Sequence, residues 1–150
     1  MASHDRERAY IAGALSGPPL TCGSESYTPL GVKTPRQGTP DQPLVSIVTV
    51  TFNAARMVEK AIQSVARQSY PEIEYIVIDG GSRDETLSIV RRNATHVDCL
   101  ISEPDKGIYE AMNKGLRRAR GRYVALLNAD DQLYPDFVAH TVAALPRSDA

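Results

Sequence analysis

The chain has 150 residues, with 17 lysines and arginines against 18 aspartates and glutamates, which gives a formal net charge of −1. This length suits one domain with a substantial core, and nucleic acid is disfavoured as a partner because no basic stripe is interleaved with aromatic residues. No apolar stretch approaches the roughly 20 residues of a membrane span. Cys22 and Cys99 lie in dissimilar contexts and predict neither a disulfide framework nor a zinc site.

Residues 1–43 differ in composition from the rest of the chain. They contain six of the ten prolines and five of the ten glycines, and no sustained period of 2 or 3.6 residues. This pattern predicts an irregular, disordered leader with one short helix near residues 6–15. No function is assigned to the leader, and the domain that carries function is expected to span residues 44–150.

Beyond the leader, apolar residues recur at the spacings of strands and helices. Residues 45–52 are apolar and β-branched, as in a strand buried on both faces. Asn53 is the predicted N-cap of the helix that follows, and Ser82 with Glu85 forms a predicted capping box. The expected elements, in chain order, are a strand at 45–52, a helix at 53–68, a strand at 73–78, a helix at 82–93, a strand at 97–102, a helix at 107–120, a strand at 123–127 and a helix from 135 to 145.

Strands that alternate with helices over short connections predict a specific fold class. The pattern is that of a three-layer α/β domain with a mainly parallel sheet, helices on both faces and right-handed crossovers. In such open sheets, ligands bind outside the carboxyl ends of the strands, near the point where the strand order reverses. The carboxyl ends of the four predicted strands are therefore the place to look for a site.

Polar residues follow each of the four predicted strands. Each ending has an ordinary alternative explanation, because Asn53 can cap a helix and Asp79 or Lys106 can simply belong to a turn. Four such endings at one edge of one sheet are harder to explain as turns alone, and they favour a polar, anionic, metal-bearing ligand. The residues concerned are Thr51, Phe52 and Asn53, then Asp79 to Ser82, then Glu103 to Gly107, and finally Asn128 to Asp131.

The adjacent pair Asp130 and Asp131 is the most informative of these endings. Two neighbouring carboxylates after a buried strand repel each other and are costly to desolvate. A solvated turn is the simplest explanation for an isolated pair of this kind. A divalent cation with a diphosphate is the alternative, since Mg²⁺ and Mn²⁺ prefer hard oxygen ligands.

Several competing nucleotide and hydrolase motifs are missing. The first predicted strand is followed by neither GxGxxG nor a GxxxxGK[ST] loop, which disfavours dinucleotide-binding and P-loop folds. The chain has no GxSxG elbow, and His96 and His140 have no nucleophile close in sequence, so hydrolase chemistry is poorly supported.

Four stretches of the chain resemble one known family. They are VSIVTVTFN at 45–53, IVIDGGSRDET at 76–86, SEPDKGIYEAMNKG at 102–115 and YVALLNADDQLYP at 123–135. On these motifs residues 44–145 resemble the N-terminal, nucleotide-sugar-binding half of a family 2 glycosyltransferase with the GT-A fold. The resemblance covers about two thirds of the chain and about the first half of a typical family domain.

The resemblance implies a function and a set of roles. It implies transfer of a sugar from a UDP-, GDP- or dTDP-sugar to a saccharide or lipid-linked hydroxyl acceptor, with inversion and with Mn²⁺ or Mg²⁺. It implies a cytoplasmic protein, free or peripheral at the inner face of the membrane, in cell envelope polysaccharide synthesis. Its site residues would be Thr51, Phe52 and Asn53 around the base, Asp79 accepting a hydrogen bond from the base, Asp105 and Lys106 beside the sugar-phosphate, Asp130 at the ribose and Asp131 at the metal.

The chain departs from the family pattern in two places. Asn128 stands where an acidic residue is common, which lowers the negative charge of the site. No residue matches the carboxylate that activates the acceptor as a general base. Glu103 and Glu110 do not take that role, so the base is expected beyond Ala150.

Two alternatives to a catalytic glycosyltransferase remain open. The chain could bind a nucleotide-sugar without catalysis, or act as a nucleotidyltransferase, although the glycine-rich loop with basic residues expected of the latter is missing. A sheet that lacks later strands is also expected to expose an apolar edge, which favours self-association.

Overall fold

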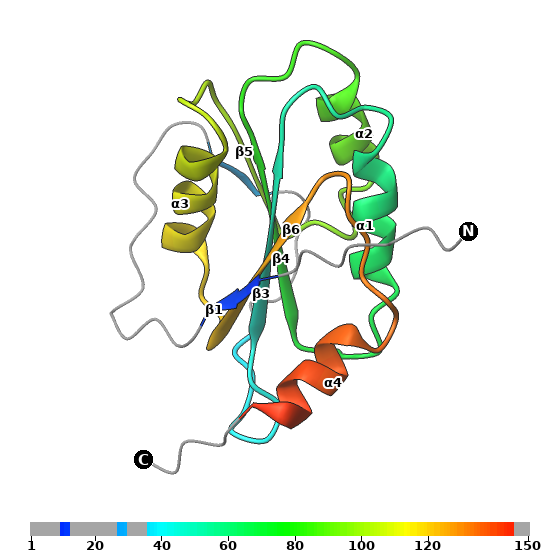
Figure 1. Cartoon of the computed structure of the whole chain (residues 1–150), viewed down its shortest axis with the longest axis vertical. Helices are drawn as coiled ribbons and strands as arrows, with labels where there is room; N and C mark the ends of the chain where they lie inside the picture. Colours follow the sequence, from blue (N-terminus) through cyan, green and yellow to red (C-terminus); the bar gives the residue numbers. More distant parts are fainter. Residues whose placement is uncertain (1–9, 13–26, 30–35, 146–150) are drawn as a thin grey trace, which may run out of the picture.

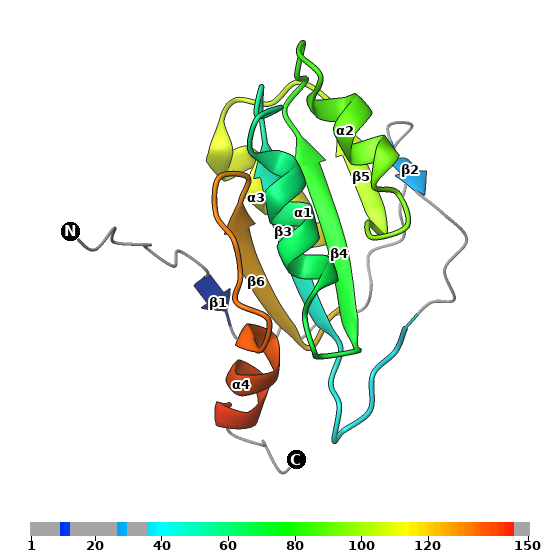
Figure 2. The ribbon, with the colours of Figure 1, turned by 90° about the vertical axis from the view of Figure 1, so that its right-hand side faces the viewer.

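The computed structural model describes residues 10–12, 27–29 and 36–145. Its centre is a sheet in which four strands run parallel in the order β6-β3-β4-β5 (Figure 2). The strands are β3 (Val45–Thr51), β4 (Ile73–Asp79), β5 (Cys99–Ser102) and β6 (Tyr123–Asn128). The predicted parallel α/β sheet is confirmed.

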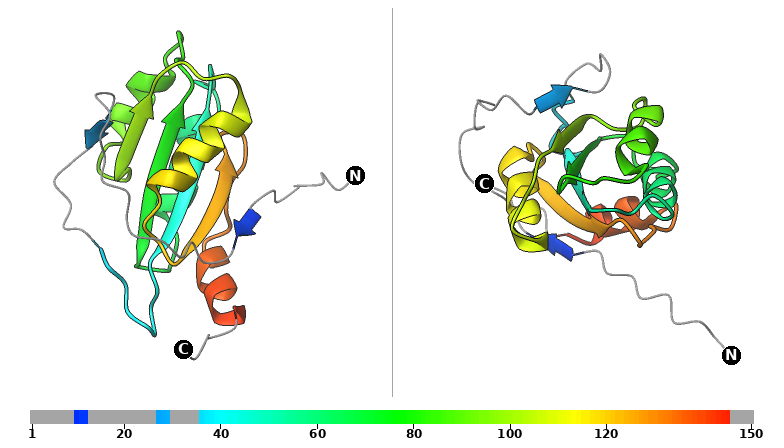
Figure 3. Two further views of the ribbon diagram at one scale, coloured as in Figure 1. Left: turned by 90° about the vertical axis from the view of Figure 1, so that its left-hand side faces the viewer. Right: turned by 90° about the horizontal axis from the view of Figure 1, so that it is seen from above.

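Helices cover both faces of this sheet, giving three layers. Figure 1 shows α1 (Val58–Ala66) and α2 (Thr86–Arg92) on one face and α3 (Ile108–Arg118) on the other. The left view of Figure 3 shows α3 lying across the parallel strands, and α4 (Phe137–Ala144) lies near the amino ends of the strands. Among the helices of the described residues, none is long and apolar enough to cross a membrane.

The two faces of the sheet bury alternate residues of each strand. In β3, Val45 and Ile47 belong to the core under α1 and α2, whereas Val48 and Val50 belong to the core under α3. This alternation follows from the two-residue period of a strand, and burial on both faces explains why β3 reads as a continuous apolar run. The α3 helix approaches β3 closely at Gly115, where an added Cβ would lie 2.2 Å from a methyl group of Val48.

Two predicted helix starts are wrong, and the same cause explains both. The α1 helix begins at Val58 rather than after Asn53, and Asn53 has a left-handed backbone with φ 46°. The α2 helix begins at Thr86, without a capping box from Ser82 and Glu85. Asn and Ser side chains compete for backbone groups outside helices as readily as they cap. Here the Asn53 and Ser82 side chains instead form hydrogen bonds between the loops after β3 and β4.

Two short strands of residues 1–43 pair with the outer parallel strands. β1 (Tyr10–Ala12) pairs antiparallel with β6, and β2 (Tyr27–Pro29) pairs antiparallel with β5. The helix predicted near residues 6–15 is therefore wrong at 10–12, and the rest of that range lies outside the described residues. Three residues of each outer parallel strand are thus paired rather than left as the bare edge expected from the sequence.

A buried polar cluster joins the sheet to the loop between α3 and β6, far from the carboxyl ends of the strands. Glu74 is 4% exposed and accepts hydrogen bonds from Ser46 Oγ at 2.7 Å, Arg120 Nε at 2.7 Å and Arg120 N at 2.9 Å. Ser46 Oγ in turn accepts from Gly121 N at 2.8 Å. Each group of this cluster is paired, as burial requires.

Candidate functional site

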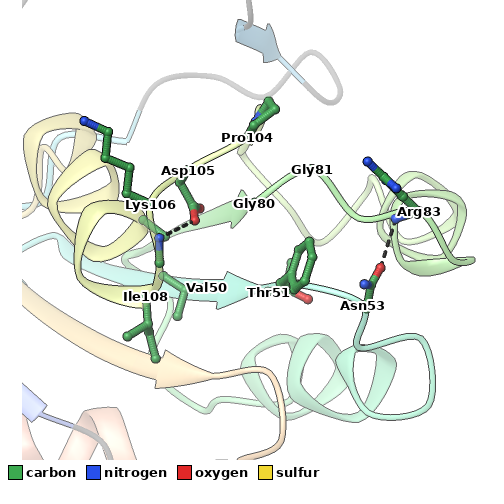
Figure 4. A pocket seen from close by; sticks show the side chains of 13 residues that line it. Val50, Thr51, Asn53, Gly80, Gly81, Arg83, Pro104, Asp105, Lys106 and Ile108 are labelled. Carbon is green, nitrogen blue, oxygen red and sulfur yellow. Dashed lines mark hydrogen bonds between the residues drawn. The ribbon is translucent and has the colours of Figure 1, made fainter.

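The carboxyl ends of β3, β4 and β5 open into one cavity of about 650 Å³ (Figure 4). Its walls come from three loops, as expected at the carboxyl edge of an open parallel sheet. Its size suits a small-molecule ligand. The lining residues are Val50, Thr51, Phe52 and Asn53 after β3, Gly80, Gly81 and Arg83 after β4, and Pro104, Asp105, Lys106, Gly107, Ile108 and Ala111 after β5.

The β3 end brings a buried hydroxyl and an exposed ring to the cavity. Thr51 is 5% exposed and its Oγ1 has no hydrogen-bond partner. A buried polar atom without a partner is costly, and a ligand in the cavity that it lines would supply one. Phe52 is 63% exposed beside it and offers an apolar surface on which a planar ring can stack.

Asn53 joins the β3 loop to the β4 loop. Its backbone N–H donates to Ser82 Oγ at 2.8 Å, and its Oδ1 accepts from the backbone N–H of Arg83 at 2.9 Å. Two further backbone groups repeat the pattern, since Ala54 N donates to Thr86 Oγ1 and Ala55 N donates to an oxygen of Asp84. These bonds between loops hold two walls of the cavity together.

A short local network affects the charge of Asp84. A hydrogen bond from the Thr86 side chain is the main cause that holds the pKa of Asp84 below its usual value, with backbone N–H groups of Thr86 and Ala55 adding to it. The Asp84 carboxyl therefore stays ionised to lower pH than an ordinary aspartate.

Asp79 lies under the β4 loop rather than on the wall of the cavity. It is fully buried, and its Oδ2 accepts hydrogen bonds from Gly81 N at 3.1 Å, Ser82 N at 3.0 Å and Ser102 Oγ at 2.8 Å. Its Oδ1 accepts from Ser82 Oγ. The direct contact with a base that the resemblance implies stays a prediction. In this structure Asp79 shapes the loop.

Asp105 and Lys106 both line the cavity, as the sequence predicts, but they are oriented differently. Asp105 Oδ1 accepts from Gly107 N at 2.9 Å, and its Oδ2 lies over Gly80, 2.8 Å from where a Cβ of that residue would be. Figure 4 shows the Lys106 side chain extending away from Gly80. Lys106 contributes its backbone N–H to Glu110 Oε2 at 2.6 Å.

Asp130 and Asp131 follow β6 and do not line the cavity. Asp130 is exposed and Asp131 is half-buried, in a turn where Asp131 N donates to Asn128 O at 3.1 Å. Asn128 Nδ2 donates to Asp131 Oδ2 at 3.3 Å. Because Asn128 is in register with Val50 of β3, this turn lies on the β6 side of the strand whose end opens into the cavity.

The donor set suits a cation that is shared with a ligand. Within the described residues no group of three or more His, Cys, Asp or Glu side chains could hold a metal by itself. Mg²⁺ and Mn²⁺ often bind through one or two carboxylates, with substrate phosphates and waters completing the octahedron. Asp130 and Asp131, after the strand next to β3, whose end opens into the cavity, fit this pattern.

Sequence reasoning missed Arg83 and Ile108 as lining residues. Arg83 comes immediately after the Asp-Gly-Gly-Ser turn, and its position in the motif was the available signal. Glu103 and Glu110, which the sequence did not favour as general bases, both have interaction partners, Lys114 for Glu103 and the backbone N–H of Lys106 for Glu110. Lys114 Nζ lies 3.0 Å from Glu103 Oε1.

Comparison with known proteins places these observations in a family. Residues 46–150 match the profile of Glycosyl transferase family 2. A PGL/p-HBAD biosynthesis glycosyltransferase of Mycobacterium bovis is 37% identical over 105 residues, which are 68% of this chain and 41% of that protein. The chain therefore spans less than half the length of this relative.

Solved structures agree with the sequence match. Mannosyltransferase PcManGT from Pyrobaculum calidifontis, in complex with GDP-Man and Mn²⁺, superposes with a TM-score of 0.65 at 31% identity, over 76% of this chain and 37% of that one. TarS 1–349 of S. aureus gives 0.62 at 26% identity, over 67% of this chain and 31% of that one. The chain belongs to glycosyl transferase family 2 and has the GT-A fold.

Proposed function

We propose that this chain binds a nucleotide-diphospho-sugar together with Mn²⁺ or Mg²⁺, as the donor-binding part of an inverting glycosyltransferase. The observation that carries the proposal is the juxtaposition at one sheet edge of the cavity and the Asp130–Asp131 turn. The cavity offers an exposed ring, a buried hydroxyl without a partner and a carboxylate. The turn offers hard oxygen ligands and nothing that could hold a cation without help.

The order of the strands orients the proposed ligand. The carboxylate pair follows β6, and the cavity lies at the ends of β3, β4 and β5, on the other side of β3 from that pair. The ribose and diphosphate would lie towards β6 and the base towards β4 and β5, beside Thr51, Phe52 and Asn53. Asp131 would hold the cation and Asp130 the ribose.

The chemistry of transfer requires charge stabilisation at the diphosphate. A bound divalent cation supplies it by neutralising the negative charge that develops on the leaving group. The residues of this chain position the donor and keep its base in place. PcManGT, which is similar to this chain, is solved with GDP-Man and Mn²⁺, and this supports both the donor class and the cation.

The acceptor would be a saccharide or lipid-linked hydroxyl in cell envelope polysaccharide synthesis, reached from the cytoplasm or from the inner face of the membrane. A second candidate is a binding module without turnover. It is favoured by the partners of Glu103 and Glu110, since a carboxylate held by Lys114 or by a backbone N–H is poorly placed to accept a proton. Measured transfer or donor hydrolysis separates the two candidates.

Titration calorimetry with UDP and GDP, with and without Mn²⁺, tests the proposal. We expect binding that requires the cation and is lost in Asp131→Ala. Asp136→Ala is the matched control, because Asp136 is an exposed carboxylate just before α4 that makes no side-chain cap bond. Binding that is equally strong without metal, or that survives in Asp131→Ala, would contradict the assignment.

A further inference from the structure

A second cavity, of about 240 Å³, lies at the amino end of β4, at the opposite end of the sheet from the candidate functional site. The length of β4 separates the two cavities by about 20 Å. The walls of the second cavity come from the last turn of α1, the start of β4, the loop between α2 and β5, and Arg36. Figure 2 shows the segment that begins at Arg36, in cyan, beside the lower end of β4.

This cavity forms because β5 is shorter than β4. Within the described part of the chain, β5 pairs with only the last four residues of β4, so the first three have no strand on that side. Side chains satisfy their backbone groups instead. Ile73 O accepts from Arg36 Nη1, and Tyr75 N donates to Asp98 Oδ2 at 2.7 Å. The free edge of β4 is therefore covered by two charged side chains, one of each sign.

Two polar side chains of the cavity are already committed to the backbone. Gln68 Nε2 donates to Tyr134 O at 2.7 Å, and the Tyr70 hydroxyl donates to Pro43 O at 2.6 Å. These bonds hold the wall of the cavity in place, and their donors are not available to a ligand.

Three other side chains of the cavity can still donate hydrogen bonds. The Arg36 guanidinium spends one of its five N–H groups on Ile73 O. The Thr95 hydroxyl and the His96 imidazole, both at the exposed rim, make no side-chain hydrogen bond with any residue that the structure describes. Because Arg36 carries a permanent positive charge, this set of donors favours an anion.

Asp98 limits how tightly an anion can bind here. Of the described lining residues it is the acidic one, and its charge balances that of Arg36. Its Oδ2 is held on Tyr75 N, which keeps that oxygen on the strand edge. We therefore expect a dissociation constant on the order of 1 mM for a simple anion.

We propose that this second cavity binds a phosphoryl group, carried either by a small soluble phosphate compound or by a lipid headgroup. The guanidinium fork of Arg36 matches two oxygens of a phosphoryl group. The third oxygen meets the donors of Thr95 and His96, whereas a carboxylate has no third oxygen to offer them. The volume is below the roughly 300–1,000 Å³ of pockets for drug-sized ligands, so it suits a small anion better than a nucleotide.

Nuclear magnetic resonance of the ¹⁵N-labelled 150-residue chain, titrated with sodium phosphate in the absence of metal and nucleotide, tests this inference. The sample contains about 0.15 M NaCl, which screens distant charges. We expect saturable shifts of the backbone N–H signals of Thr95 and His96 and of the Arg36 Nε–H signal. Sodium acetate should bind at least about 3-fold more weakly, because it leaves one set of donors unused.

Three variants separate the cavity from the general charge of the surface. Arg36→Gln should weaken phosphate binding by about 10-fold or more, the scale of a hydrogen bond to a charged group. Thr95→Val should weaken it by about 3-fold and leaves the bond from Arg36 to the backbone in place. Arg67→Gln is the matched control, because Arg67 is an exposed arginine at the end of α1 that does not line the cavity, and its affinity should stay within about 2-fold of the wild type.

Sedimentation with phosphatidylcholine vesicles, with and without phosphatidic acid, identifies the source of the phosphoryl group. Binding of free phosphate assigns a soluble ligand. Binding only to vesicles that contain phosphatidic acid, lost in Arg36→Gln, assigns a lipid headgroup, and either result supports the site.

Phosphate shifts that map elsewhere, or equal affinities in Arg36→Gln and Arg67→Gln, without vesicle binding that depends on Arg36, would overturn the inference. UDP binding with Mn²⁺ should be the same in all three variants as in the wild type, since the two cavities lie at opposite ends of the sheet. Failure of the wild type to bind any nucleotide would instead overturn the proposed function and leave the phosphoryl site standing.

Discussion

Glu74 is expected to be a main source of stability at the end of the sheet opposite the site. Its Oε2 accepts two hydrogen bonds and its Oε1 accepts one from Arg120 Nε. In Glu74→Gln the amide oxygen can keep the first two, but the amide nitrogen then faces the Nε donor. The loss is one charge-assisted hydrogen bond, and since the Arg120 side chain is 40% exposed and can turn to water, we expect a cost of about 2 kcal/mol.

Urea unfolding followed by far-ultraviolet circular dichroism measures this cost, since the chain contains no tryptophan. The matched control is Glu59→Gln, because Glu59 pairs with Arg92 at 3.6 Å on the surface, where ion pairs contribute less than about 1 kcal/mol. Nucleotide binding by folded Glu74→Gln should equal that of the wild type. Equal losses of unfolding free energy in the two variants would refute the argument that burial makes the Glu74 cluster strong.

Three further outcomes follow from contacts described above. Gly115→Ala should destabilise the protein by about 1–3 kcal/mol in urea unfolding, since its methyl group would overlap a buried valine of β3. Tyr75→Phe should lower the free energy of unfolding by about 1–2 kcal/mol, because it removes the hydroxyl that is hydrogen-bonded to the buried Thr49 hydroxyl at 2.9 Å and leaves the latter without a partner. Adding Thr49→Val removes that unpaired hydroxyl and should recover part of the loss. The lowered pKa of Asp84 stabilises the fold above the unfolded-state pKa of about 4, and the contribution disappears as pH falls through the folded-state value. The difference in melting temperature between wild type and Asp84→Asn should therefore be largest near neutral pH and shrink towards pH 3; a constant difference would contradict this account.

The sheet and its helices could be predicted from the sequence because periodicity carries that information. The strands of β3 and β4 are apolar on both faces, and this pattern is specific to a parallel sheet covered by helices. The starts of α1 and α2 could not be predicted in the same way. Asn53 and Ser82 have the chemistry of caps, but their partners are backbone groups of another loop, which no local pattern shows.

The sequence predicted the position of the candidate site better than the role of each residue in it. Convergence at the carboxyl edge follows from topology, so Thr51, Phe52, Asn53, Asp105 and Lys106 were correctly expected to lie together. The burial of the Asp79 carboxylate depends on a donor from β5, Ser102, that is distant in sequence. The strands at 10–12 and 27–29 escaped prediction because three residues are too few to show a period.

The pairing of β1 with β6 has a consequence for the order in which this protein folds. Tyr10 is opposite Leu126, so the segment at 10–12 must wait for a partner that lies far along the chain. Contacts between such distant positions form late and slow the folding of the whole chain. The parallel strands β3, β4 and β5 can pair with one another before β6 is made. The segment at 10–12 can join the sheet only after β6 has emerged.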